Sequence, residues 1–259
     1  MIYMKFLSQL HTDIGTTKET NQDSLCVKKA LTEKGEVIMV VVCDGMGGLE
    51  KGEVASATVA YRFSKWFESD LPGLLDKEDV FGAIRYDWLS IIKTLNSDIS
   101  AYGKEHHISL GSTVTAMLIL EDGEYIIGHV GDSRAYCIDN EIKILTEDHT
   151  VVANEVKTGR ITAEQAKTDP RRNVLLQCVG ASRYVEPDFI RGSAVANQCY
   201  MLCSDGFRHF VESEEFLKIL SPENNDSKES IKRNIVSITE ENKRRGESDN
   251  ISAILIRTM

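Results

Sequence analysis

The sequence predicts an α+β fold built mainly from antiparallel sheets. Two long helical patterns follow each other at residues 53–67 and 79–102, and runs rich in β-branched residues are grouped before and after them. Helices that are grouped, and do not alternate with strands, argue against a doubly wound parallel sheet. The Asp122-Gly123 dipeptide between two β-rich runs is typical of a hairpin turn between antiparallel strands.

Short apolar runs predict the strands. The clearest is 37–43, which is mostly β-branched, too short for a typical helix and followed by a Gly-rich segment. Runs at 113–120, 124–130 and 134–139 lie so close in sequence that we predict a three-stranded meander. The remaining strands are expected at 6–15 (an edge strand with its loop), 23–29, 140–145, 188–192, 198–203 and 251–256.

Apolar residues at helical spacing predict the helices. In 79–102 a stripe that includes Trp88 and Leu95 lies on one face, and Pro72-Gly73 separates this helix from the one at 53–67. We interpret these stripes as core and not as cofactor contacts. Shorter helices are expected at 151–157, 163–167, 212–220 and 227–244.

Length and composition indicate one folded domain, residues 1–259, in a soluble, cytoplasmic and monomeric protein. The chain is 42% hydrophobic, and no apolar run approaches the roughly 20 residues that span a bilayer. The first residues show no secretory signal, so no membrane association is expected. A net charge of −10 argues against nucleic-acid binding. The six scattered cysteines are expected to be reduced core thiols.

Five aspartates stand at the ends of predicted strands. Taken alone, Asp44 in Asp44-Gly45 indicates either a site or a turn, because Asp-Gly is also a hairpin signal. The pattern recurs, however, and aspartates at strand ends far apart in sequence can converge at one end of a sheet. A carboxylate at the mouth of a buried strand is costly unless a cation pairs with it, and hard oxygen ligands suit Mg²⁺ or Mn²⁺. We therefore predict a cluster of divalent ions, with the Gly45 carbonyl as a further ligand, around Asp23, Asp44, Asp132, Asp205 and Asp249.

Residues 146–187 differ in character from the rest of the chain. A long irregular insertion between strands is uncommon unless it is functional. Within it, Arg171 and Arg172 either contact an anionic substrate or form a solvated pair. Outside it, His129 is expected to be a hydrogen-bonded core residue, and His106-His107 a surface pair.

Taken together, the motifs resemble those of the metal-dependent protein phosphatases, the PPM or type-2C serine/threonine phosphatases, of the compact bacterial kind. Each motif is weak singly, but their joint order and spacing across nearly the whole chain are specific. The motifs are Asn21-Gln22-Asp23-Ser24, Asp44-Gly45-Met46-Gly47-Gly48, Gly111-Ser112-Thr113, Gly131-Asp132-Ser133-Arg134-Ala135-Tyr136, Thr146-Glu147-Asp148-His149, Pro170-Arg171-Arg172-Asn173, Ser204-Asp205-Gly206 and Asp249-Asn250.

This resemblance implies a sandwich of two mainly antiparallel β-sheets flanked by pairs of α-helices, with 146–187 as a flap. It implies two Mn²⁺ or Mg²⁺ ions bridged by Asp44, with the Gly45 carbonyl on one ion and Asp205 and Asp249 on the other. Asp23 would act near the second ion through water, and Asp132 would help to hold a third, weaker metal. The implied catalytic carboxylates are Asp44, Asp205 and Asp249. The implied activity is hydrolysis of phosphoserine and phosphothreonine in proteins by a metal-activated water, reversing a partner serine/threonine kinase.

Two positions depart from the family pattern. Lys18 stands where bacterial members usually carry an arginine that grips the substrate phosphate, and lysine keeps the charge but not the bidentate fork. Lys18 is therefore either a weaker phosphate ligand or a simple loop lysine. Met46 stands where some members carry a histidine proposed as general acid, and a thioether cannot donate a proton. Two alternatives to a protein phosphatase stay open, a non-catalytic phosphoprotein-binding module on the same fold and a small-molecule phosphatase.

Overall fold

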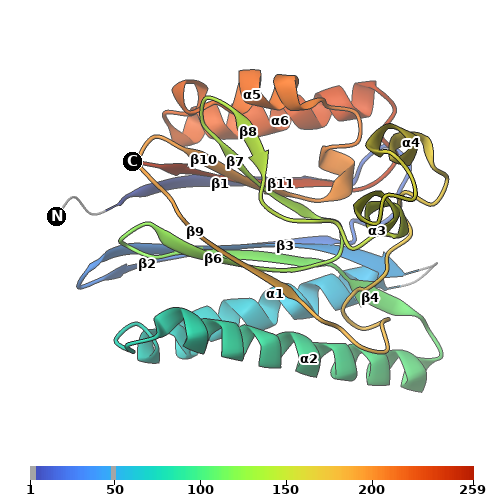
Figure 1. The fold of residues 1–259 in the computed structure, drawn as a ribbon, viewed down its shortest axis with the longest axis horizontal. Coiled ribbons are helices and arrows are strands. Elements are labelled where there is room, and N and C mark those ends of the chain that lie inside the picture. The colour runs from blue at the N-terminus through green and yellow to red at the C-terminus, as the bar shows by residue number, and fades with distance from the viewer. Residues whose placement is uncertain (1–3, 48–50) are drawn as a thin grey trace.

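The computed structural model describes residues 4–47 and 51–259 as two antiparallel sheets that pack face to face between two layers of helices (Figure 1). This confirms the predicted α+β sandwich. Helices α1 (Gly52–Ser69) and α2 (Val80–His106) cover one sheet, and α5 (Ser213–Leu220) and α6 (Lys228–Arg244) cover the other. Gly48, the last residue of the motif that begins at Asp44, lies outside the described residues.

Each sheet has an edge strand from the N-terminal part of the chain. The first sheet has the order β1-β11-β10-β7-β8, and the second has the order β2-β3-β5-β6-β9, with β4 paired to β3. The first sheet contains β1 (Phe6–Asp13), β11 (Ile251–Thr258), β10 (Cys199–Cys203), β7 (Arg134–Ile138) and β8 (Ile142–Ile144). The second contains β2 (Asp23–Thr32), β3 (Gly35–Gly47), β5 (Val114–Ile119), β6 (Glu124–Val130), β9 (Asp188–Ser193) and β4 (Leu110–Ser112).

The uninterrupted apolar run of β3 follows from burial on both faces. Successive side chains of a strand point to opposite faces of the sheet. Met39 and Val41 pack with α1 and α2, whereas Val40 and Val42 pack against the other sheet. A strand covered on both sides needs no polar alternation, which is why the sequence shows a continuous run. The helix-side layer also contains Phe63, Trp66 and Trp88, and the layer under α6 contains Ile231, Ile235 and Ile238.

The predicted three-stranded meander is wrong. β5 and β6 form the expected hairpin around Asp122-Gly123, with Gly123 at φ 89°. The chain then crosses to the other sheet, where β7 pairs with β10 and β8. The crossing occurs at Gly131, whose φ of 110° lies in the left-handed region that favours glycine. A three-residue connection resembles a hairpin loop in the sequence, so spacing alone does not reveal the change of sheet.

The segment 146–187 lies at one end of the sandwich and contains α3 (Val151–Lys157) and α4 (Ala163–Thr168). Arg171 pairs with Glu155 and with Asp169, each at 2.8 Å, so its guanidinium joins parts of the segment to one another. Arg172 is exposed. His106 and His107 are both exposed, as predicted, although His106 is the last residue of α2 and not part of a loop. None of the helices in the two described ranges is long and apolar enough to cross a membrane.

His129 is a buried core histidine, as predicted. Its Nε2 donates to the carbonyl of Glu147 at 3.0 Å, and its Nδ1 lies 2.9 Å from the Thr115 hydroxyl. Burial lowers the pKa of His129 to about 4, and the neighbouring His149 lowers it further against the effect of nearby carboxylates. The ring is therefore neutral in the folded protein at neutral pH.

This burial predicts a pH dependence of stability. Between pH 6.5 and pH 4 the unfolded chain binds a proton at His129 that the folded protein does not, so acidification favours unfolding. The contribution reaches about 3 kcal/mol of the free energy of unfolding. In His129→Gln, urea unfolding from pH 7 to pH 4 should show a shallower loss of stability than the wild type. Parallel curves for the two proteins would contradict this assignment.

Candidate metal centre

Asp23 and Asp44 face each other across two paired strands. They are register partners where β2 begins and β3 approaches its end. The Asp44 N–H donates to the Thr113 hydroxyl at 2.9 Å, and the Thr113 N–H donates to the Asp44 carbonyl at 2.9 Å. Because β3 continues through Asp44 and Gly45 to pair with β4, the hairpin-turn interpretation of Asp44-Gly45 is excluded.

Gly45 occupies a position with no room for a side chain. Its N–H donates to the Gln22 carbonyl at 3.1 Å. A Cβ at this position would lie 2.3 Å from the Gly52 carbonyl oxygen and 2.4 Å from that of Gln22. The glycine therefore allows the start of α1 to approach β3 directly beside Asp44.

The carboxylates of Asp23 and Asp44 have fewer hydrogen-bond and positively charged partners than carboxylates shielded from water normally have. The Ser204 hydroxyl donates to Asp23 Oδ2 at 2.9 Å, but Oδ1 is buried and has no hydrogen-bond partner. Burial raises the pKa of Asp23 to about 7, and the Asp205 and Asp249 charges raise it against the opposing hydrogen bonds of two serines. Burial also raises the pKa of Asp44 well above its usual range, and the Asp23 and Asp205 carboxylates add to this effect.

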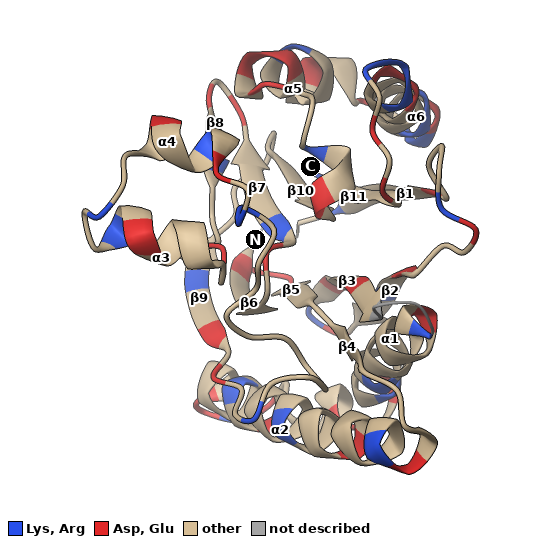
Figure 2. Cartoon of the chain, turned by 90° about the vertical axis from the view of Figure 1, so that its right-hand side faces the viewer, with Lys and Arg blue, Asp and Glu red and all other residues tan. Residues whose placement is uncertain are grey.

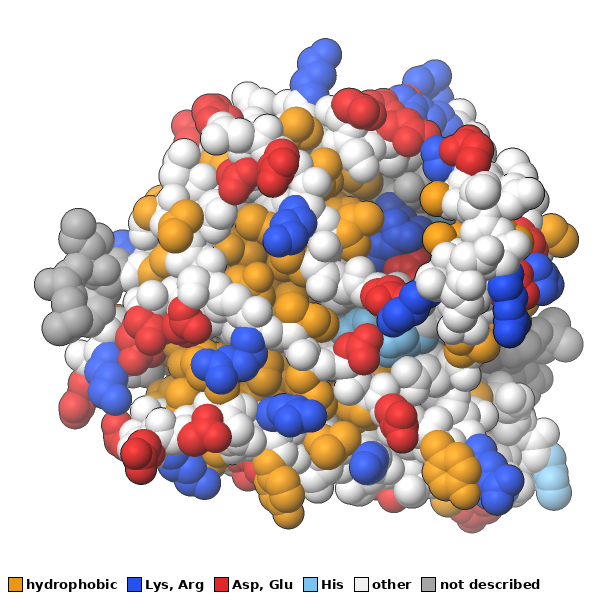
Figure 3. Space-filling view, viewed as in Figure 1, with side chains coloured by type: hydrophobic (Ala, Val, Ile, Leu, Met, Phe, Trp, Pro, Cys, Tyr) orange, Lys and Arg blue, Asp and Glu red, His pale blue; other side chains and the backbone are white. Residues whose placement is uncertain are grey.

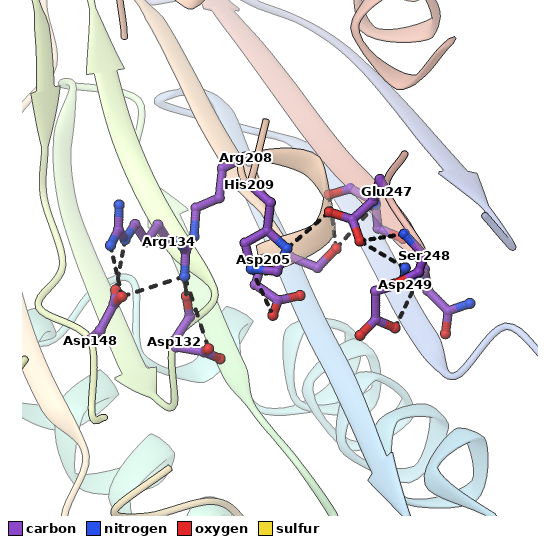
Figure 4. Close-up of polar contacts among 12 residues, drawn as sticks. Asp132, Arg134, Asp148, Asp205, Arg208, His209, Glu247, Ser248 and Asp249 are labelled. Carbon is purple, nitrogen blue, oxygen red and sulfur yellow. Dashed lines mark hydrogen bonds and ion pairs between the residues drawn. The ribbon is translucent and has the colours of Figure 1, made fainter. Parts of the chain in front are cut away.

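Asp205 and Asp249 come from the other sheet and lie at the same end. Asp205 opens the 3-10 turn Asp205–Phe207 after β10, and Asp249 directly precedes β11. Asp205 Oδ2 lies 3.3 Å from His209 Nε2, and the His209 Nδ1 lies 2.9 Å from Glu247 Oε2. Glu247 Oε1 in turn accepts the N–H groups of Ser248 at 2.7 Å and Asp249 at 2.8 Å (Figure 4).

His209 keeps the carboxylate of Asp205 ionised. Burial alone would raise the pKa of Asp205, but the hydrogen bond and charge of His209 outweigh it and lower that pKa to about 2. Burial lowers the pKa of His209, whereas its bonds to Asp205 and Glu247 raise it to about 9. Asp205 thus has a counter-charge within the protein, unlike Asp23 and Asp44.

Asp132 lies beside a partly buried arginine, Arg208. Burial raises the pKa of Asp132 to about 7, and the charge of Asp205 adds to this. Arg208 Nη2 donates to the Asp132 carbonyl at 3.0 Å and lies 3.9 Å from Asp132 Oδ2. The same nitrogen lies 3.4 Å from Asp148, which also accepts two bonds from Arg134 (Figure 4). The guanidinium of Arg208 therefore offsets part of the charge near Asp132.

Lys18 points into the same acidic group. Its Nζ lies 2.8 Å from Asp249 Oδ1, and both side chains are about two-fifths exposed. Burial lowers the pKa of Lys18, but its bond to Asp249 outweighs this and the net pKa is raised. The ammonium is thus paired with a carboxylate and would have to move away from it to reach a phosphate.

The donor chemistry of this end of the sandwich fits hard divalent cations. Figure 2 looks onto it, with the acidic residues between the two sheets. In the part of the chain that the structure describes, no three His, Cys, Asp or Glu side chains are already arranged around one metal position. The orphaned Asp23 Oδ1 and the raised pKa values of Asp23 and Asp44 nevertheless mark a buried group of oxygen donors that lacks positive charge. Small side-chain movements toward an ion would relieve this repulsion.

A groove adjoins this acidic end. It has a volume of about 580 Å³ and is lined by Met46 and by residues of 146–187 that include Leu176, Arg183 and Tyr184. Beside the α3–α4 part of this segment, Figure 3 shows acidic, basic and histidine side chains gathered in a hollow. Met46, which lines the groove, is two residues from Asp44 on the same strand.

Sequence reasoning did not single out His209, Glu247 or Arg208 as site residues. Their spacing offered a signal, because His209 follows Asp205 by four residues and Glu247 precedes Asp249 by two. Charged residues on a surface helix show the same spacing. The spacing therefore indicates a contact in the site only when the 3-10 turn is known.

Comparison with known proteins identifies the family. The model of the family described as protein phosphatase 2C matches residues 15–238. The chain belongs to the protein phosphatase 2C family. The predicted enzyme class, a protein-serine/threonine phosphatase, is thereby confirmed. A relative named serine/threonine phosphatase stp, from Listeria innocua, is 32% identical over 254 residues, which cover 96% of this chain and 94% of that protein.

Solved structures agree with this membership of the protein phosphatase 2C family. The serine/threonine phosphatase of S. agalactiae has a TM-score of 0.83 and 29% identity, covering 98% of this chain and 99% of that one. The catalytic domain of the serine/threonine protein phosphatase PstP, solved in complex with two manganese ions, has a TM-score of 0.77 and 27% identity. It covers 99% of this chain and 99% of that one.

Proposed function

We propose that this chain hydrolyses phosphoserine and phosphothreonine in proteins at a centre that holds two Mn²⁺ or Mg²⁺ ions. The observation that carries the proposal is the partly buried pair Asp23 and Asp44 of the second sheet, with the unpartnered Oδ1 of Asp23, at the same end of the sandwich as Asp205 and Asp249 of the first sheet. The two manganese ions of the PstP complex support the same choice of metal.

In this proposal each acidic residue has a separate role. Asp44 would help to hold both ions, the Gly45 carbonyl would bind one, and Asp205 and Asp249 would bind the other. Asp23 would act through water near the second ion. When bound, the ions would supply a water of lowered pKa and offset charge on the phosphoryl oxygens.

Asp132 is proposed to help hold a third, weaker metal. The guanidinium of Arg208, 3.9 Å from the Asp132 carboxylate, would compete with that ion. Met46 has no proton to donate, so any protonation of the leaving oxygen is proposed to come from water.

Lys18 is proposed to grip the substrate phosphate after leaving Asp249. Removal of its charge in Lys18→Ala should raise KM about tenfold, with a smaller fall in kcat, because a charged hydrogen bond to the substrate is lost. Lys18→Arg should leave KM unchanged or lower it. Lys28→Ala serves as control, because Lys28 lies on β2 and pairs with Glu68 of α1. An unchanged KM in Lys18→Ala would refute the phosphate role.

The segment 146–187 is proposed to act as a flap over the substrate within a single catalytic domain, residues 1–259. The groove between this segment and Met46, which is lined by both apolar and polar side chains, supports a peptide substrate, since it offers space for side chains next to the phosphorylated residue. Physiological substrates would be products of a serine/threonine kinase partner.

We further propose that the protein acts as a cytoplasmic monomer, consistent with its net charge of −10.

A competition assay separates protein from small-molecule substrates. A phosphothreonine peptide with apolar flanking residues and a panel of phosphorylated metabolites would compete for the enzyme in the presence of Mn²⁺. We expect the peptide to have the higher kcat/KM. A metabolite that outcompetes every phosphopeptide would instead favour a small-molecule phosphatase.

A further inference from the structure

A side-chain bridge joins two of the proposed metal ligands, Asp205 and Asp249, through residues that the proposed chemistry does not use. His209 lies between two carboxylates, with its Nε2 3.3 Å from Asp205 and its Nδ1 2.9 Å from Glu247. Because a carboxylate only accepts hydrogen bonds, Nδ1 of His209 donates to Glu247, and Nε2 makes a charge contact with Asp205. The bridge crosses from the end of β10 to the start of β11 (Figure 4).

Glu247 uses both of its carboxylate oxygens in this bridge. One oxygen faces His209, and the other accepts the backbone N–H groups of Ser248 and Asp249. The residue is 2% exposed, and its own N–H donates to the Asn242 carbonyl at 3.0 Å. A buried carboxylate with this many partners fixes the backbone on which Asp249 stands.

We propose that His209 and Glu247 are positioning residues that hold the Asp205 and Asp249 carboxylates at the separation needed to bind one divalent ion. The inference rests on the proposed metal role of these two aspartates. Asp205 is oriented directly by the His209 ring, whereas Asp249 is oriented through its backbone. Residues that hydrogen-bond to metal ligands fix their direction, and their removal typically weakens metal binding about 10- to 100-fold.

A purely structural ion pair would behave differently from this bridge. Loss of a structural pair lowers the stability of the metal-free protein and leaves its affinity for metal unchanged. Loss of the bridge lowers the affinity for Mn²⁺, and the effects of the two single changes are not additive because both break the same connection.

Calorimetric titration of the metal-free, full-length protein with MnCl₂ tests the proposal. The variants are His209→Gln, Glu247→Gln and the double variant. Glu36→Gln is the matched control, because Glu36 also accepts a backbone N–H, from Phe6 at 3.0 Å, and pairs with Lys29 at 2.6 Å. Glu36 lies near the first residue of β3, whereas Asp44 lies near its last.

We expect Mn²⁺ affinity to fall about 10- to 100-fold in each single variant. The double variant should bind Mn²⁺ about as tightly as the single variant with the lower affinity. Glu36→Gln should bind Mn²⁺ as the wild type does. Wild-type affinity in His209→Gln and Glu247→Gln would overturn the inference while leaving the proposed function intact. A wild-type protein that takes up no Mn²⁺ would overturn the proposed function as well. Should Glu247→Gln fail to fold, His209→Gln, whose side chain is less buried, decides the question alone.

Discussion

Asp44→Asn should abolish phosphatase turnover. The amide has nearly the same volume as the carboxylate, but it lacks the charge through which Asp44 is proposed to bridge two cations. The loss should not come from unfolding, because partial burial and the repulsion of Asp23 and Asp205 raise the pKa of Asp44 well above its usual range. The melting temperature of the metal-free variant is therefore expected to equal or exceed that of the wild type.

Activity against a phosphothreonine peptide, measured with Mn²⁺ in excess, checks this expectation. Asp122→Asn is the matched control, because Asp122 also precedes a glycine but lies in a hairpin turn, where its side chain accepts the N–H of Glu124 at 3.0 Å. That variant should keep wild-type activity. Wild-type turnover in Asp44→Asn under these conditions would remove the central carboxylate from the mechanism.

Gly45→Ala is expected to cause the second-largest loss. The added methyl group would lie 2.3 Å from the Gly52 carbonyl oxygen and 2.4 Å from that of Gln22, and both contacts are to backbone that cannot rotate away. Overpacking of this kind costs about 1–3 kcal/mol of stability. A displacement near 1 Å of the neighbouring Asp44 would also cost about 10²-fold in kcat.

Melting temperature and kcat measured together test this prediction. Gly73→Ala provides the comparison, since a Cβ at Gly73 meets no atom within 4 Å. We expect that variant to match the wild type in both measurements. Full activity and an unchanged melting temperature in Gly45→Ala would show that the start of α1 can move away from β3 without cost.

The strands and helices with the strongest patterns could be predicted because burial alone determines them. The run at 37–43 is apolar on both faces since one face packs on α1 and α2 and the other on the opposite sheet. The stripe on α2 that contains Trp88 follows from burial on one face only. The aspartates could be recognised because a charged side chain at the end of such a strand departs from the apolar pattern that burial imposes.

The change of sheet at Gly131 could not be predicted in the same way. Pairing of β7 with β10 joins residues far apart in the chain, and no local pattern records that choice. The short strand β4 was missed as a strand for the same reason, because its three residues pair with the end of β3 after the whole of α1 and α2.

The contacts that the site residues make also depend on tertiary structure and could not be predicted from local sequence. The ion pair of Lys18 with Asp249 joins positions at opposite ends of the sequence. The bridge from Asp205 through His209 to Glu247 depends on a 3-10 turn that brings His209 back toward Asp205. Residue types identified the carboxylates, but tertiary structure alone shows what surrounds them.

Metal dependence of phosphopeptide hydrolysis is the most direct test of the proposed centre. The wild-type protein would be freed of metal with EDTA, passed through a desalting column and assayed on a phosphothreonine peptide with no metal, Mg²⁺ or Mn²⁺. The account predicts no turnover without metal and full recovery with Mn²⁺ or Mg²⁺. Hydrolysis that persists in EDTA, or folded protein that stays inactive with every metal, would contradict it.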